Sequence, residues 1–246
     1  MSIRTDSPPL APSAIPNGNG AAQPRVMLQA IAAPSILGLF AFAGSTFIVA
    51  SNLAGWYGTP DSPLVLAPFA AVFGGAAQLL AGMWSYRARD GIATAAHGAW
   101  GSFWIAYGIL WLLLATGTIA TPKPWYNAPE LGWWFFALAI ITFSCAVAAL
   151  FESVVLFGVL GTLTVGSAIL AWGLTDSSLN SVKVAGWVLV LSAALAWYAA
   201  TALMLVGVTG REVLPLLKRP HPTRPAGAEM AEVDVPWAEP GIKHGQ

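Results

Sequence analysis

The chain has 246 residues, of which 57% are hydrophobic and only 9% are charged, with a mean hydropathy of +0.67. An ordinary soluble domain carries about a quarter charged residues, so this chain lacks the polar surface that a water-exposed globule needs. Its formal net charge of zero gives no electrostatic affinity for nucleic acid. Because Cys145 is the only cysteine and the three histidines are scattered, we expect no disulfide, no metal and no cofactor. The composition predicts an integral membrane protein.

Six apolar runs have the length of membrane spans. Between Ala32 and Val208 there are nine Asp, Glu, Lys or Arg residues, and they separate apolar runs of roughly 20 residues, enough to cross about 30 Å of hydrocarbon. The runs lack the alternation of apolar and polar residues that barrel strands show. We therefore predict an all-α integral membrane protein with six transmembrane helices. In chain order the predicted spans are 33–52, 64–85, 95–117, 131–151, 154–174 and 184–208.

The distribution of basic residues predicts the orientation. With six spans both termini lie on one side, and of the 11 Lys and Arg residues only Lys123 and Lys183 fall on the other side. Cytoplasmic connections carry an excess of Lys and Arg, so both termini are predicted to be cytoplasmic. The Pro-rich segments 1–31 and 217–246 are expected to be disordered, and to flank a six-helix transmembrane domain over 32–216.

Spans two and three each carry small and polar residues on one helical face. Gly74, Gln78 and Gly82 are spaced by four in span two, and His97 and Trp100 lie about one turn apart in span three. Two interpretations remain open for this pattern. Glycines and an amide can join neighbouring helices closely, or they can line a passage through the bundle.

Spans one and five show similar stripes. Gly38, Phe42, Ser45 and Thr46 share a face of span one, while Gly158, Thr162 and Gly166 share a face of span five, beside Leu163 and Thr164. No Asp, Glu, Lys or Arg falls in the middle of any predicted span, so a carrier driven by a buried carboxylate is disfavoured. No motif of a hydrolase, a metalloprotease or a nucleotide-binding loop occurs, so we do not expect an enzyme. The remaining mechanism is passage of a small solute through an apolar constriction.

A long block of residues resembles a known family. The run from Gly74 to Tyr86, followed by the run from Trp100 to Trp104, resembles the acetate uptake transporter family, which includes the succinate–acetate permeases. Supporting matches are Leu37-Gly38-Leu39 near the start, Ala185-Gly186-Trp187 at the head of span six and Gly210-Arg211-Glu212-Val213-Leu214-Pro215 after it. The likeness covers about residues 32–216, which is essentially the whole transmembrane domain.

The resemblance implies both an assembly and a site. It implies a homo-hexamer in the cell membrane, in which each six-helix protomer has its own passage for acetate or a related small monocarboxylate, with succinate as a further candidate. It also implies that an aromatic residue of span one, an aromatic residue of span three and a leucine of span five form the constriction; these fall on Phe42, Trp100 and Leu163. Tyrosine is commoner in the family at the position of Trp100, so the constriction here lacks a hydroxyl group.

A pathway for a small carboxylate is the leading hypothesis, either channel-like or linked to protons. Polar groups beside the constriction would replace part of the hydration of the solute, and the candidates for this pore lining are Gln78, Ser45, Thr46, Thr164, His97, Gly74 and Gly82. Two alternatives remain open. The uncharged lining also suits another small solute such as ammonia, and a membrane scaffold or sensor could have kept the fold without transporting anything.

Overall fold

The computed structural model describes residues 31–219. In this part of the chain there are seven α-helices and one π-helical segment, and no β-strand longer than an isolated bridge. The elements are α1 (Ser35–Leu53), α2 (Ser62–Phe69), η1 (Ala70–Ala77), α3 (Gln78–Ala88), α4 (Gly91–Ala115), α5 (Pro129–Ala149), α6 (Val154–Thr175) and α7 (Leu179–Thr209). The predicted terminal segments 1–31 and 217–246 lie almost entirely outside the described residues.

The six predicted spans are confirmed. Six helices of the described chain are long and apolar enough to cross a membrane, and α2, η1 and α3 together form one of them, Ser62–Ala88. The predicted limits of most spans agree with these helices within about four residues, and the largest difference is at the start of α7. The chain is therefore an all-α, multi-pass membrane protein.

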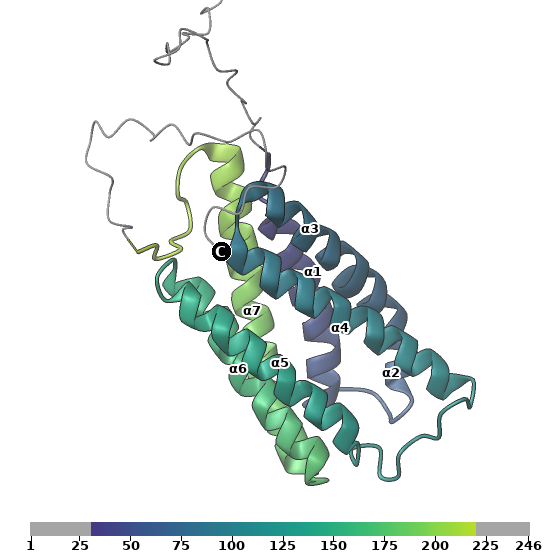
Figure 1. The fold of residues 1–246 in the computed structure, drawn as a ribbon. Coiled ribbons are helices and arrows are strands. Elements are labelled where there is room, and N and C mark those ends of the chain that lie inside the picture. The colour runs from purple at the N-terminus through teal and green to yellow at the C-terminus, as the bar shows by residue number, and fades with distance from the viewer. Residues whose placement is uncertain (1–30, 220–246) are drawn as a thin grey trace, which may run out of the picture. The chain divides into compact units, whose positions relative to one another are not determined.

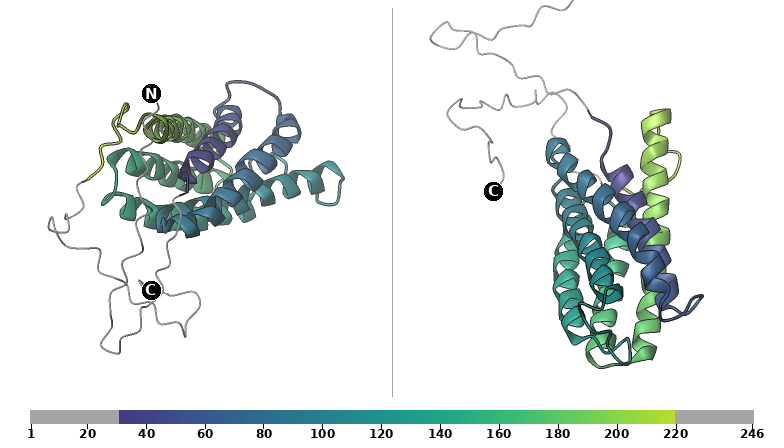
Figure 2. Two further views of the ribbon diagram at one scale, coloured as in Figure 1. Left: turned by 90° about the horizontal axis from the view of Figure 1, so that it is seen from above. Right: turned by 90° about the vertical axis from the view of Figure 1, so that its right-hand side faces the viewer.

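The helices pack as a closed ring (Figures 1 and 2). Helix α1 packs against α7, α7 against α6, α6 against α5, α5 against α4, and α4 against α3 and η1, which return to α1. Much of the apolar outer surface is exposed, including Trp133, Phe143 and Val208. Such a surface is unfavourable in water and suited to lipid.

The second span changes its hydrogen-bonding pattern in the middle. Pro68 lies inside α2, where it lacks the N–H group that a helix interior uses, and the π-helical segment η1 begins two residues later. Further along the same span, Gly82 of α3 lies against the backbone of Gly98 in α4, so closely that an added Cβ atom would be 2.8 Å from the Gly98 nitrogen. The glycines of this span therefore let α3 and α4 touch along their backbones.

The chain after α7 folds back over one end of the ring. The hydroxyl of Ser153, in the turn between α5 and α6, donates a hydrogen bond of 2.6 Å to the carbonyl oxygen of Leu216. Ser153 also forms an isolated antiparallel bridge with Lys218, and the backbone N–H of Arg219 donates to the carbonyl oxygen of Glu152. These bonds fix the last described residues beside the α5–α6 turn.

Candidate functional site

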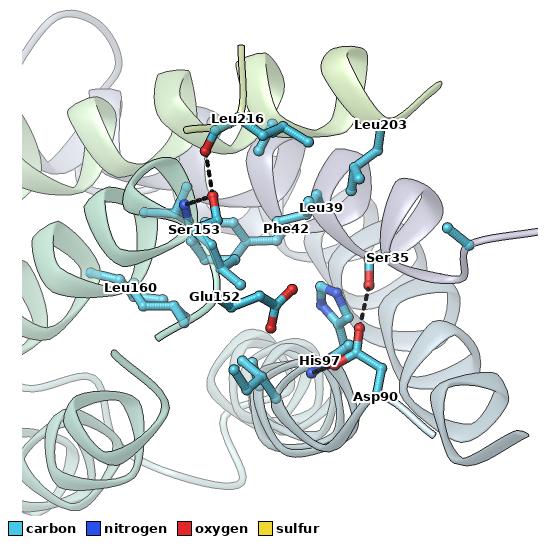
Figure 3. A pocket seen from close by; sticks show the side chains of 18 of the residues that line it. Ser35, Leu39, Phe42, Asp90, His97, Glu152, Ser153, Leu160, Leu203 and Leu216 are labelled. Carbon is cyan, nitrogen blue, oxygen red and sulfur yellow. Dashed lines mark hydrogen bonds between the residues drawn. The ribbon is translucent and has the colours of Figure 1, made fainter. Parts of the chain in front are cut away.

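A cavity of about 160 Å³ opens at the end of the ring where α3 turns into α4. Its mouth carries the carboxylates of Asp90 and Glu152 (Figure 3). The ammonium group of Lys218 belongs to the same lining. We call it the charged cavity. Asp90 is held in place because its side chain caps α4, accepting a hydrogen bond of 2.8 Å from the backbone N–H of Ala93. Deeper in, the walls become apolar, with Leu39 of α1 and Leu160 of α6.

A second cavity, of about 370 Å³, lies towards the opposite end of the ring. Its walls are rich in aromatic side chains, so we call it the aromatic cavity: they are Tyr57, Trp100, Phe103, Trp104, Tyr107, Trp111, Trp125 and Phe135. Of the described residues that line this cavity, Lys183 is the only acidic or basic one of the kinds Asp, Glu, Lys and Arg. The two cavities therefore differ in charge, with two carboxylates and one ammonium group at one mouth and a single ammonium group at the other.

The three predicted constriction residues lie together at the inner end of the charged cavity. Phe42 of α1, Trp100 of α4 and Leu163 of α6 all line this cavity, and each side chain is at most 3% exposed. The rings of Phe42 and Trp100 meet edge to face, with centroids 6.0 Å apart. Trp100 also lines the aromatic cavity, so its indole ring lies between the two.

A hydrogen bond fixes the ring of Trp100. Its indole nitrogen donates to the hydroxyl oxygen of Thr142 on α5 at 3.0 Å, and that hydroxyl donates in turn to the carbonyl oxygen of Leu138. The side chains of Phe103 and Phe42 pack against the same indole ring. Contacts with α1, α4 and α5 thus hold this side chain across the interior.

Three of the predicted polar residues line the cavities. Gln78 and His97 line the charged cavity, where the amide nitrogen of Gln78 lies 3.4 Å from Nδ1 of His97. Thr46 lines the aromatic cavity. The hydroxyl of Thr46 and the amide oxygen of Gln78 are buried and have no hydrogen-bond partner among the described residues. A buried polar atom without a partner costs free energy, and a polar solute that enters the cavity can supply one.

The other predicted residues contribute to neither of these two cavities. An added Cβ atom at Gly74 would lie 2.5 Å from the hydroxyl oxygen of Ser45, so these two residues pack α1 against η1. Gly82 contacts α4, and the hydroxyl of Thr164 donates to the carbonyl oxygen of Leu160, one turn earlier in its own helix. Gly74 and Gly82 therefore lie at helix contacts, as the helix-packing interpretation expects.

The charged residues at the mouth were missed as site residues. Asp90 lies in the short connection between α3 and α4, Glu152 lies in that between α5 and α6, and Lys218 lies beyond the last span. The sequence did contain a signal for Asp90 and Glu152, because they are two of only nine Asp, Glu, Lys or Arg residues between residues 32 and 208. Lys218 carried no such signal, since its place depends on the fold of the chain after α7. Within residues 31–219 no group of three His, Cys, Asp or Glu side chains is placed to hold a metal ion.

Relatives with known names match most of the chain. The succinate-acetate/proton symporter SatP of Escherichia coli is 28% identical over 186 residues, which cover 76% of this chain and 95% of that protein. Ammonia transport outward protein 2 of Saccharomyces cerevisiae is 25% identical over 181 residues, covering 69% of this chain and 60% of the relative. Both names describe transporters and neither describes an enzyme.

A solved structure shares the fold. The structure of the bacterial acetate channel SatP superposes with a TM-score of 0.70 at 28% sequence identity, and covers 76% of this chain and 99% of that one. The model of the GPR1/FUN34/yaaH family matches residues 18–212, which include all six spans. The resemblance found in the sequence is confirmed, and the chain belongs to the GPR1/FUN34/yaaH family of membrane proteins.

Proposed function

We propose that the protein transports acetate or a related small monocarboxylate across the cell membrane, through the charged cavity, past Trp100 and out through the aromatic cavity. One observation carries the proposal: Trp100 lines both cavities, so a single layer of side chains separates them. Succinate is a further candidate substrate. The names of SatP as a succinate-acetate/proton symporter and as an acetate channel support this class of solute.

The apolar junction between the two cavities, formed by Phe42, Trp100 and Leu163, favours the neutral form of the solute. A carboxylate that leaves water for the space between Phe42, Trp100 and Leu163 loses its hydration, and Coulomb attraction does not compensate because no charged group lies there. The effective cost of burying an ion is several kcal/mol, whereas a neutral acid loses only its hydrogen bonds. The neutral acid is therefore the species that crosses, and its flux carries a proton.

The orientation follows from the positive charges. Of the described Lys and Arg residues, only Lys123 and Lys183 lie at the end of the aromatic cavity; at the end of the charged cavity are Arg87, Arg89, Arg211, Lys218 and Arg219. The positive-inside rule supports a cytoplasmic location for the charged cavity and for both termini. A homo-hexamer remains a prediction from the family resemblance.

Uptake of labelled acetate into proteoliposomes tests the proposal. We expect purified protein to accelerate uptake above that of protein-free liposomes at neutral pH, and unlabelled propionate and lactate to compete with it. An unlabelled succinate arm measures whether the passage also admits a dicarboxylate. Uptake equal to the protein-free rate for every acid would contradict the proposal and favour the scaffold alternative.

A second candidate solute is ammonia, which the name of the yeast relative supports. An uncharged junction admits a small neutral base as well as a neutral acid. The same liposomes with an internal pH dye separate the two solutes, because acetic acid acidifies the interior and ammonia makes it alkaline. Alkalinisation without any acetate uptake would replace the first proposal by the second.

A further inference from the structure

The indole nitrogen of Trp100 is the only polar side-chain atom at the junction between the two cavities. The other two constriction residues, Phe42 and Leu163, have hydrocarbon side chains, and an indole N–H group can only donate. This N–H donates to the hydroxyl oxygen of Thr142 at 3.0 Å, and the side chains of Trp100 and Thr142 are 3% and 1% exposed. As long as this bond is kept, the three constriction side chains offer a solute no hydrogen-bonding group.

The hydroxyl of Thr142 has a fixed direction. A hydroxyl group has one proton, and Thr142 donates it to the carbonyl oxygen of Leu138 at 2.7 Å, one turn earlier in α5. Its oxygen is therefore the acceptor for the indole N–H of Trp100. Each group in this series has the partner that it needs, and a buried donor that lost its partner would cost free energy. The series holds the N–H of Trp100 on α5.

Thr142 lies behind the indole ring. It belongs to the buried face of α5 that also carries Phe135 and Leu138, and it lines neither the charged nor the aromatic cavity. The ring of Phe135 contacts Phe103 with centroids 5.2 Å apart, and Phe103 packs against Trp100 at 5.3 Å. The hydroxyl of Thr142 can therefore act on a solute only through Trp100.

We propose that Thr142 is a positioning residue that makes the passage selective for unsubstituted alkyl carboxylic acids over hydroxylated ones. By accepting the N–H of Trp100 it holds the indole ring across the passage and keeps the one polar atom of the constriction away from the solute. A hydroxyl group on the solute then leaves water without gaining a partner among these side chains, which costs free energy. An alkyl group of similar size has no such hydrogen bonds to lose. This assignment rests on the proposed transport of carboxylic acids.

Propionate and glycolate form a matched pair for the test, because a methyl group in one replaces a hydroxyl group in the other. We would measure the initial uptake of each labelled acid into proteoliposomes at one pH, subtract the uptake of protein-free liposomes and divide by the concentration of neutral acid. The wild-type protein is expected to favour propionate. Equal normalised rates for the two acids in the wild-type protein would contradict the proposed selectivity, whatever any variant does.

Thr142→Val removes the hydroxyl and nearly keeps the shape of the side chain. The indole N–H of Trp100 then lacks its partner, and the hydroxyl oxygen of glycolate can supply one. We expect the ratio of glycolate to propionate uptake to rise by about 2- to 10-fold, the net worth of one hydrogen bond. Thr142→Ser keeps the hydroxyl and should keep the wild-type ratio. The ratio does not depend on the amount of folded protein, so a less stable variant still gives an answer.

Two further variants separate positioning from a structural role. Thr175→Val on α6 removes a hydroxyl that also donates to a carbonyl oxygen one turn earlier, that of Ala171, at 2.8 Å, and it should leave the ratio unchanged. Trp100→Phe removes the N–H itself, so adding Thr142→Val to it should cause no further rise. A rise of equal size with and without the indole N–H would overturn the assignment, because the two residues would then act independently.

NMR of protein labelled with nitrogen-15 in its indole groups observes the bond directly. The chain has 12 tryptophans, and the signal of Trp100 is the one that Trp100→Phe removes. We expect Thr142→Val to move this indole proton to lower chemical shift, and Thr142→Ser to leave it near its wild-type position. An unmoved signal in Thr142→Val would contradict the positioning role. Absence of uptake of both acids by the wild-type protein would instead reject the proposed function and with it the selectivity, whereas the indole signal would still decide whether Thr142 holds the ring.

Discussion

Replacing Trp100 with alanine is expected to raise the flux of acetate and to relax selection by size. The indole ring lies between the charged and the aromatic cavity, and its removal joins them. If the ring sets the barrier, each decrease of about 1.4 kcal/mol raises the rate tenfold. Larger acids should gain most, so the ratio of butyrate to acetate uptake in proteoliposomes rises. The measurement is initial uptake of each labelled acid.

Trp104→Ala is the matched control for this substitution. Trp104 is one turn further along α4, is equally buried at 3% exposed, and lines only the aromatic cavity of the two. Both substitutions remove an indole ring from the core, and each costs about 3–5 kcal/mol of stability. If they change acetate flux and its size selection to the same extent, Trp100 does not form the constriction.

Replacing Gly101 with alanine is expected to destabilise the fold. An added Cβ atom at this position would lie 2.6 Å from the backbone nitrogen of Leu79 on α3. Backbone atoms cannot turn aside as a flexible side chain can, so α3 and α4 must separate. Overpacking of this kind costs about 1–3 kcal/mol. The prediction is a lower midpoint of thermal unfolding in detergent, with weaker acetate transport because α4 also carries His97 and Trp100.

Gly98→Ala provides the control on the same helix. A Cβ atom at Gly98 meets nothing within 4 Å, and alanine favours a helix over glycine by about 0.5–1 kcal/mol. The thermal midpoint should therefore stay the same or rise slightly. An equal loss of stability in both variants would show that the contact between α3 and α4 at Gly101 does not decide the outcome.

The membrane architecture could be predicted from the sequence because its physical signal is strong. A run of about 20 apolar residues crosses a bilayer as an α-helix, because a helix satisfies the hydrogen bonds of its own backbone. The constriction residues were predicted through family resemblance, and the structure brings Phe42, Trp100 and Leu163 together from three helices. Their role in transport remains a prediction.

The division between packing and lining residues could not be predicted. Spacing places Gly74, Gln78 and Gly82 on one face, but it does not show which neighbour that face meets. The structure places the two glycines at helix crossings and Gln78 at a cavity wall. For Glu152 and Lys218 the decisive contact is between the α5–α6 turn and the chain after α7. That contact joins residues more than 60 positions apart, so no local pattern reveals it.

Blocking the junction is the most direct test of a passage through it. Leu163→Cys in a Cys145→Ala background places a single thiol in the cavity that Phe42 and Trp100 also line, since Cys145 is the only native cysteine. The thiol would be modified with a benzyl methanethiosulfonate, and mass spectrometry would verify that modification is complete. The account predicts that acetate uptake then falls to the rate of protein-free liposomes and recovers when a reductant removes the benzyl group. Unchanged uptake by the fully modified protein would contradict it.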